Sequence, residues 1–159
     1  MRTFDHYLLL TQKWLSGMHE VAKWKWNHGL IESDLTQEER LLDHLSYLAA
    51  TNGLPEEWAE KVIRAQIEAS NLVMAHDFQI WQREGAGELE EWDLQSQLHP
   101  YLCMLTSEMF YLLGRLYPYL EKNEMDNRLL QPPLSRRSCD QIPYPAWQKA
   151  LSVFILKQL

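Results

Sequence analysis

The 159-residue sequence has little of what marks the specialised protein classes. Its two cysteines are too few for a disulfide framework, and no stretch approaches the roughly 20 apolar residues that a membrane-spanning helix needs. Fifteen Lys and Arg stand against 22 Asp and Glu, so the chain lacks the basic excess that binds nucleic acid. It also lacks a basic amphipathic arm for a membrane surface. We therefore expect neither nucleic acid nor membrane as a partner.

An export signal is also missing from the first 18 residues. Arg2, Asp5 and Lys13 interrupt them, and no small-residue cleavage site follows. The sequence as it stands predicts a cytoplasmic protein, or a periplasmic or secreted one if a signal peptide has been removed. Cys103 lies in an apolar segment and is expected to be a buried free thiol, with a disulfide to Cys139 as the alternative.

What is present is typical of a single globular domain over residues 1–159. Hydrophobic residues make up 46% of the chain and charged residues 23%, which is enough apolar surface for a core without cross-links. Seven Trp and seven Tyr are a large aromatic share for this length. Aromatic side chains in such number must line either the core or a pocket.

Helical periodicity dominates the chain, and no segment alternates like a β-strand. Leu10, Trp14, Met18 and Lys25 recur at spacings of four and seven, so they share one stripe of a first helix. A second helix is predicted over residues 34–51, where an Asn-Gly pair supplies a left-handed stop.

The third predicted helix is very long. Pro55 suits a first helical turn, and Glu56 and Glu57 place two carboxylates at the positive end of the helix dipole. Nothing interrupts the helix before Arg83, and the Gly-Ala-Gly of residues 85–87 ends it. A helix of nearly thirty residues is well above the usual length.

The second half of the chain contains more proline. Residues 88–93 form an acidic segment that we interpret as a solvated linker. A further apolar helix is predicted over residues 94–120, with Pro100 and Pro118 marking bends or ends.

A proline-rich loop over residues 131–145 leads to a last helix over residues 146–159. There are no internal repeats. The sequence therefore predicts an all-α fold, a single-domain bundle of about six helices with one very long helix.

The first helix carries a recognisable motif. Residues 14–26 resemble the first-helix signature of the exported, gamma-type, all-helical chorismate mutases, which is Arg-Leu, a few residues, Val-Ala, two residues and Lys-Trp. This chain has Trp14-Leu15, then Val21-Ala22, then Lys25-Trp26. The match covers residues 8–81. Within this range, its further matching segments are residues 31–34, 49–54 and 66–70. The resemblance implies a chorismate mutase type II-like fold and a homodimer whose sites each lie within one chain.

The reaction of that family indicates which residues should matter. Chorismate is a dianion that rearranges to prephenate in one pericyclic step, and charge builds on the ether oxygen whose bond is breaking. Such a site needs cationic clamps for two carboxylates and a donor for the ether oxygen, held in a dry pocket. Arg is the natural clamp because its planar fork binds a carboxylate bidentately. The resemblance therefore implies two or three Arg, a Lys and a Glu or Gln.

Only part of this set is present. Lys25 stands at the position of the family's substrate-binding lysine, Asp34 matches the acidic residue at the start of the second helix, and Ser70 stands where a small hydroxyl or Lys is usual. Trp14 and Gln37, however, occupy the places of two arginines. Each missing charge-assisted contact costs roughly 1.5–3 kcal/mol, so efficient chorismate rearrangement is not expected.

The remaining positions are mostly apolar. Leu41 and Met74 stand where Gln or Glu would reach the ether oxygen. The spacing puts Gln37 and Leu41 on one helix stripe with Asp34, and Gln66 on another with Ser70 and Met74. Three helices thus present one cation, one carboxylate and much apolar surface to a shared interior.

This pattern favours a repurposed enzyme with an apolar, aromatic pocket for a small cyclic or aromatic metabolite. Its chemistry would be of isomerase or lyase type, as in specialised metabolism: rearrangement, cyclisation, elimination or proton transfer. Lys25 and Asp34 are the catalytic candidates. The substrate-binding candidates are Trp14, Met18, Gln37, Leu41, Gln66, Ser70 and Met74. No cofactor is expected, and no metal, because the six His show no ligand-like spacing.

Two other interpretations stay open. The chain could be a divergent chorismate mutase that has rebuilt its clamp from residues such as Arg136 and Arg137. It could also be a non-catalytic ligand-binding or interaction protein on the same fold. A ligand-shaped cavity at Lys25 would favour the repurposed enzyme over the non-catalytic protein, and arginines lining that cavity would favour the chorismate mutase.

Overall fold

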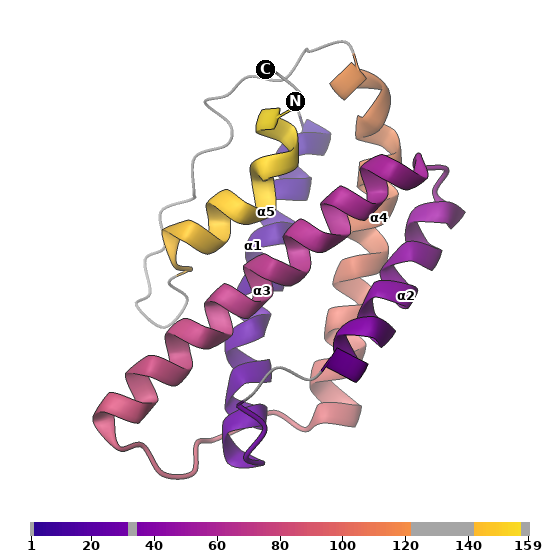
Figure 1. Cartoon of the computed structure of the whole chain (residues 1–159). Helices are drawn as coiled ribbons and strands as arrows, with labels where there is room; N and C mark the ends of the chain where they lie inside the picture. Colours follow the sequence, from indigo (N-terminus) through magenta and orange to yellow (C-terminus); the bar gives the residue numbers. More distant parts are fainter. Residues whose placement is uncertain (1, 32–34, 122–141, 157–159) are drawn as a thin grey trace.

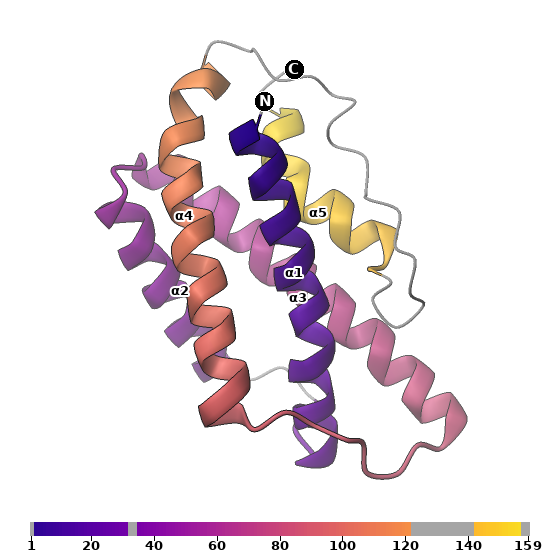
Figure 2. The same cartoon turned by 180° about the vertical axis from the view of Figure 1, so that it is seen from behind.

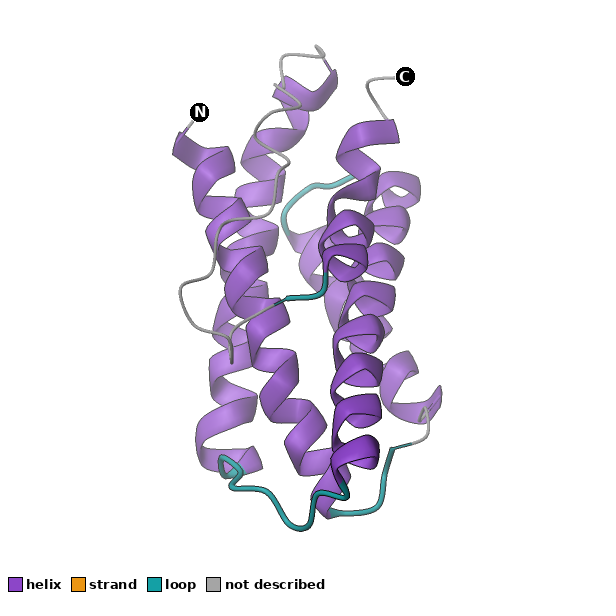
Figure 3. Ribbon diagram, turned by 90° about the vertical axis from the view of Figure 1, so that its left-hand side faces the viewer, coloured by secondary structure: helices purple, strands orange, loops and turns teal. Residues whose placement is uncertain are grey.

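A computed structural model describes residues 2–31, 35–121 and 142–156. Within these ranges the chain is helical and contains no strand (Figure 3). The helices are α1 (Arg2–Asn27), α2 (Leu35–Thr51), α3 (Glu56–Glu84), the π-helical turn η1 (Leu94–Leu98), α4 (His99–Glu121) and α5 (Tyr144–Leu156). The all-α class and the very long helix predicted from the sequence are confirmed. None of these helices is both long and apolar enough to span a membrane.

The helices α1 to α4 form an elongated bundle, and α5 covers one side of it. Figure 2 shows α1 and α4 side by side, with α2 and α3 behind them. The short α5 lies across α1 and α3 (Figure 1), and it packs mainly on α3. The described helices thus enclose one continuous hydrophobic core, to which all five α-helices contribute.

Glycines in a left-handed conformation follow the ends of α2 and α3. Gly53 and Gly85 adopt φ angles of 72° and 63°, a left-handed conformation that glycine reaches without strain. The Gly85 N–H donates to the Gln82 carbonyl, and the Ala86 N–H reaches the Trp81 carbonyl at 2.9 Å. These bonds satisfy carbonyls that the end of α3 would otherwise leave open.

Two prolines bear on the predicted helix ends. Pro118 lies inside α4, which continues to Glu121, so it does not end the helix. The predicted loop over residues 131–145 ends two residues early, because α5 begins at Tyr144 and includes Pro145. Proline is favoured in a first helical turn, where its missing N–H costs nothing. The rest of that loop lies outside the described residues.

The segment after α3 is a loop, and α4 does not begin directly at its predicted start. Residues 94–98 form a π-helical turn before α4 begins at His99. Asp93 caps this turn, since its carboxylate accepts the Ser96 N–H at 2.8 Å. The hydrogen bonds from Ser96 also hold the pKa of Asp93 below its usual value.

Some of the aromatic side chains lie in the core, whereas others are exposed, namely Tyr47, Trp92, Tyr111, Tyr119 and Tyr144. Phe154 of α5 meets Phe4 and Tyr7 of α1 edge to face, with ring centroids 5.6 and 5.5 Å apart. Trp58 of α3 and Tyr117 of α4 lie 5.1 Å apart. Such pairs contribute about 0.5–1.5 kcal/mol each beyond the area that they bury. These contacts pack α5 against α1 and α4 against α3.

Close approach between helices depends on glycine at one point. A Cβ on Gly114 of α4 would lie 2.8 Å from the carbonyl oxygen of Asn52, in the turn between α2 and α3. No side chain fits there without moving backbone. Gly114 thus sets how closely α4 packs against that turn.

Candidate functional site

The predicted site residues of α1 and α3 face each other across the bundle. Three contacts connect the two helices in register: Tyr7 with Gln66, Trp14 with Ser70, and His19 with Asp77. Residue numbers rise together along both helices, so α1 and α3 run in the same direction.

Trp14 and Ser70 bind each other. The Trp14 indole Nε1–H donates to the Ser70 Oγ at 3.0 Å, and the Ser70 hydroxyl in turn donates to the Gln66 carbonyl at 2.8 Å. Trp14 exposes 4% and Ser70 3% of its surface. The sequence resemblance puts Trp14 at the position of a family arginine and Ser70 at that of a family hydroxyl. At these two positions the groups available to a substrate are therefore engaged with one another.

The polar chain continues to a buried tyrosine that the sequence prediction missed. The Gln66 Nε2–H donates to the Tyr7 hydroxyl at 3.2 Å, and Gln66 Oε1 is buried without a hydrogen-bond partner in the described structure. Burial raises the pKa of Tyr7 to about 12, although hydrogen bonds from Thr11 and Gln66 act in the opposite direction. Tyr7 precedes Trp14 by two helical turns, and that spacing is the signal that could have placed it on the same face.

The apolar candidates are packed. Met18 and Met74 are buried and belong to the core, and Leu41 of α2 is half-buried against it. Gln37, by contrast, is exposed on α2. The interior that three helices were predicted to share is thus filled by Trp14 and the two methionines, and Gln37 lies at its outer edge.

Two hollows of the described surface lie elsewhere. One, of about 400 Å³, is lined by residues at the start of α1 and in the last turns of α4. The other, of about 510 Å³, is lined by Gln79, Gln82 and Arg83 of α3. None of the predicted site residues lines either hollow.

Lys25 is separated from the Trp14–Ser70 pair along α1. Eleven residues at 1.5 Å each place it about 16 Å further along the helix. Its side chain is half-buried, and it has no ion-pair partner among the residues that the structure describes. Asp34, the other catalytic candidate, lies outside the described residues, as do Arg136, Arg137 and Cys139. Cys103 is a free, half-buried thiol.

A second pair across α1 and α3 was not predicted. His19 Nδ1 lies 2.5 Å from Asp77 Oδ2, and both side chains are nearly buried. His19 Nε2 is buried without a partner in this part of the structure. Asp77 falls on the stripe of Gln66 and Ser70, a spacing of four and seven that could have drawn attention to it.

The described side chains offer no evident metal centre, because no three His, Cys, Asp or Glu of the described ranges gather closely enough to hold an ion. The polar groups gathered between α1 and α3 around Trp14 are the Ser70 hydroxyl, the Gln66 amide, the indole N–H and the Tyr7 phenol. These groups donate and accept hydrogen bonds but carry no charge at neutral pH. Lys25 is the described candidate that supplies a cation.

Comparison with known proteins places this geometry in a family context. No protein-family model and no curated protein matches the sequence. Among solved structures, a chorismate mutase from Burkholderia thailandensis superposes with a TM-score of 0.82 and 27% identity, over 97% of this chain and 99% of that one. The chain has the chorismate mutase fold. A chorismate mutase from Burkholderia phymatum gives a TM-score of 0.76 at 20% identity, over 97% of this chain and 98% of that one, and supports the fold alone.

The chorismate mutase fold matches from one end of the chain to the other. The resemblance found on residues 8–81 therefore extends, in three dimensions, to α4 and α5 as well. The coverage of both chains is nearly complete, at 97% of this chain and 99% of the other.

Proposed function

We propose that this protein is a divergent chorismate mutase that converts chorismate to prephenate slowly. The observation that carries the proposal is the whole-length superposition on a chorismate mutase, at a TM-score of 0.82 with 97% of this chain covered. A fold by itself does not define a reaction, so the argument also depends on what the site residues can do.

Lys25 is the residue that supports substrate binding. Its side chain is half-buried and has no described ion-pair partner, and the sequence resemblance puts it where the family's lysine binds substrate. A cation without a counter-ion favours the arrival of an anion. In this proposal Lys25 holds one carboxylate of chorismate, and the apolar walls exclude water.

The neutral site residues set the expected rate. Replacing two clamping arginines by Trp14 and Gln37 removes two charge-assisted contacts of roughly 1.5–3 kcal/mol each. Each 1.36 kcal/mol is a tenfold change. If both contacts act in the transition state, turnover falls roughly 10²- to 10⁴-fold below that of an enzyme with the full clamp. Substrate must also separate the Trp14 indole from Ser70 to reach that part of the interior.

The first test is a direct assay of chorismate loss and prephenate formation, compared with buffer alone. We expect turnover above the uncatalysed rate and below the usual enzymatic range of roughly 1–10³ s⁻¹. A rate inside that range would contradict the argument from the missing arginines.

The second test restores the charges. The double variant Trp14→Arg/Gln37→Arg should raise turnover at least tenfold, and Gln37→Arg alone, at an exposed position, should raise it less. The matched control is Gln79→Arg/Gln82→Arg, which adds the same charge to exposed positions of α3. If folded wild type and both arginine variants give no prephenate, the proposal fails.

A second candidate function is favoured by the packing of the interior. The bond between Trp14 and Ser70, with the burial of Met18 and Met74, fills the space that a substrate would use. This packing suits a non-catalytic protein on the old enzyme fold. The repurposed enzyme would instead need an open aromatic pocket at Lys25. Binding of benzoate or cinnamate near Lys25 without any prephenate formation would favour the repurposed enzyme over both other functions.

A further inference from the structure

The hollow between the start of α1 and the end of α4 has features that the chorismate reaction does not use. It measures about 400 Å³ and is lined by Thr3, Gly114, Arg115, Pro118 and Tyr119. We call it the Arg115 hollow. Its volume falls within the range of small-molecule sites, about 300–1,000 Å³. It lies at the opposite end of α1 from Lys25.

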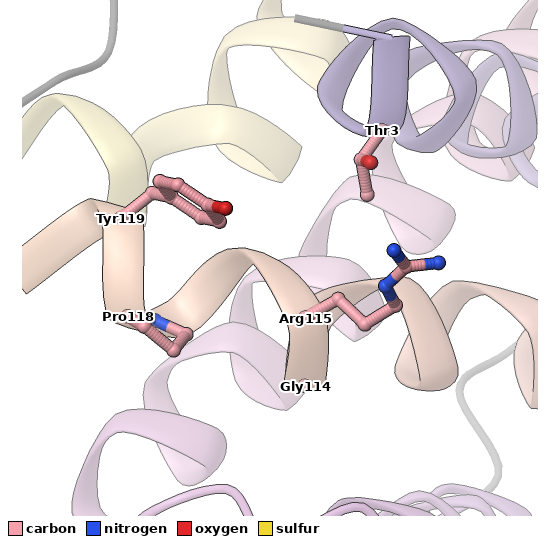
Figure 4. Close-up of a pocket in the computed structure, with 5 residues that line it drawn as sticks. All are labelled: Thr3, Gly114, Arg115, Pro118 and Tyr119. Atoms are coloured by element: carbon pink, nitrogen blue, oxygen red, sulfur yellow. The ribbon is translucent and has the colours of Figure 1, made fainter.

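Its charge comes from an arginine that has no counter-ion among the described residues. Arg115 is exposed and makes no ion pair with any described residue, whereas Arg64 on α3 pairs with Glu60. The acidic residue two turns before it on α4, Glu108, is already engaged by His6 at 3.2 Å. Figure 4 shows the Arg115 side chain directed toward Thr3.

The start of α1 adds to the positive potential. Thr3 lies in the first turn of a 26-residue helix, where backbone N–H groups lack helical partners and the helix dipole is positive. Asp5 is also in this first turn, but two residues turn a helix by about 200°. Its carboxylate therefore projects from another side of α1 than Thr3 does. Guanidinium, hydroxyl and helix start thus favour an oxyanion.

The opposite wall of the hollow is apolar. The Tyr119 ring is 46% exposed, and Figure 4 shows it beside Pro118, with its hydroxyl turned toward the same space as Thr3 and Arg115. A bare inorganic ion would leave these rings uncovered. A flat organic body attached to the oxyanion would cover them and remove apolar surface from water.

We propose that the Arg115 hollow binds a small organic anion. Its carboxylate or phosphate group lies between Arg115 and Thr3, and its body packs on Pro118 and Tyr119. Arg115 suits either oxyanion because its planar fork donates two parallel hydrogen bonds. The site is independent of the interior residues, so it stands or falls separately from the proposed chorismate activity.

The test uses the full-length chain and four probes, namely benzoate, phenyl phosphate, inorganic phosphate and benzyl alcohol. Binding is followed by calorimetry and by the backbone amide NMR signals of Thr3, Arg115 and Tyr119. We expect benzoate and phenyl phosphate to shift these signals, and inorganic phosphate to bind at least fivefold more weakly than phenyl phosphate. Benzyl alcohol, which lacks the charge, should not bind. Preference for benzoate or for phenyl phosphate distinguishes a carboxylate ligand from a phosphate ligand.

Two matched variants decide the assignment. Arg115→Met keeps the length of the side chain and should weaken binding of the two organic anions at least tenfold. Arg83→Met removes an exposed arginine from the other hollow and should leave binding unchanged. Circular dichroism checks that both variants fold, and prephenate formation should be the same in both. Equal binding to wild type and Arg115→Met, or binding of benzyl alcohol as tight as that of benzoate, would overturn the proposal.

Discussion

Lys25 occupies an unusual position for a lysine, half-buried on the core-facing stripe of α1 with no described counter-ion. The charge has a role if it meets a substrate carboxylate. If the position is structural packing alone, an apolar side chain would serve there as well.

The variant Lys25→Met separates these two roles. If Lys25 binds substrate, turnover of chorismate should fall roughly 10- to 100-fold, the value of one charge-assisted contact. The melting temperature should stay the same or rise, because a fitted apolar group replaces an unpaired charge. Lys13→Met, at an exposed position of the same helix, is the control. A raised melting temperature with no loss of binding or turnover would mean that Lys25 has no functional role.

Tyr7 gives a pH-dependent prediction at the same scale. Its pKa is about 12 in the folded chain and 10.0 in the reference state, so the folded state retains the proton over a range in which the unfolded state loses it. Stability from this group is therefore complete below pH 10 and is lost as the pH rises toward 12. The loss amounts to roughly 2–3 kcal/mol for two pKa units.

The measurement is denaturant unfolding of wild type and Tyr7→Phe at several pH values. At neutral pH the variant should be less stable by about 1–3 kcal/mol, because Gln66 loses its partner. That difference should shrink as the pH passes from 10 to 12. Tyr47→Phe, at a side chain that is 69% exposed, should show no such trend. A stability difference between wild type and Tyr7→Phe that stays constant from pH 10 to 12 would contradict a pKa of about 12 for Tyr7.

Among the elements, α1 and α3 are joined by the contact between His19 and Asp77. Removing one member of a nearly buried hydrogen-bonded pair leaves the other unsatisfied and costs about 1–3 kcal/mol, and more for a charged group. Replacing both by apolar groups removes that penalty. We therefore expect His19→Leu and Asp77→Leu each to cost about 3 kcal/mol, and the double variant to cost much less than their sum.

A double-mutant cycle by urea unfolding measures this coupling. The exposed Arg64–Glu60 pair on α3 is the control, and its coupling should be within about 0.5 kcal/mol. If the two couplings are equally small, the contact between His19 and Asp77 does not hold the helices together.

The elements also show what the sequence could and could not predict. Periodicity was sufficient to place Trp14 on a core-facing stripe of α1 and Ser70 on one of α3, because burial of an apolar face repeats every three to four residues. Periodicity does not give the depth of a side chain. Gln37 has the spacing of an interior residue and is exposed.

Contacts between residues far apart in the chain could not be predicted from the sequence. The Trp14–Ser70 bond joins residues 56 apart in the chain, and the bond depends on how closely α1 and α3 pack and on the rotamer of each side chain. The His19–Asp77 contact, over 58 residues, went unpredicted for the same reason. The helical periodicity of apolar residues predicts which helix faces pack together. Which side chains on those faces form hydrogen bonds depends on the packed geometry.

On the scale of the whole molecule, self-association remains a prediction. The resemblance to exported chorismate mutases implies a homodimer, and Met104 and Tyr111 are 56% and 55% exposed on one face of α4. We expect a dimer by light scattering at micromolar concentration. Met104→Glu/Tyr111→Glu should shift it toward the monomer, while Leu72→Glu on α3 should not. A monomeric wild type would contradict the prediction.

The segment that joins α3 to α4 is also tied to the end of α1. The Asn27 side chain donates through Nδ2 to the Leu89 carbonyl at 2.7 Å and accepts the Leu89 N–H through Oδ1 at 2.8 Å. The Trp26 indole donates to the Gly87 carbonyl at 3.0 Å. The Asn27 side chain thus pairs with both backbone groups of Leu89, as an adjacent β-strand would.

These two hydrogen bonds should slow hydrogen exchange at the Leu89 amide. A loop amide usually exchanges freely, but the Leu89 N–H can do so only when Asn27 releases it, so its exchange should report opening of the α1 terminus. In deuterated buffer we expect the Leu89 amide to be protected to the same extent as the last amides of α1. Asn27→Ala should abolish that protection while the amides in the middle of α3 keep theirs. The exchange rate of an amide in the segment between α3 and α4 would then report how often the end of α1 opens.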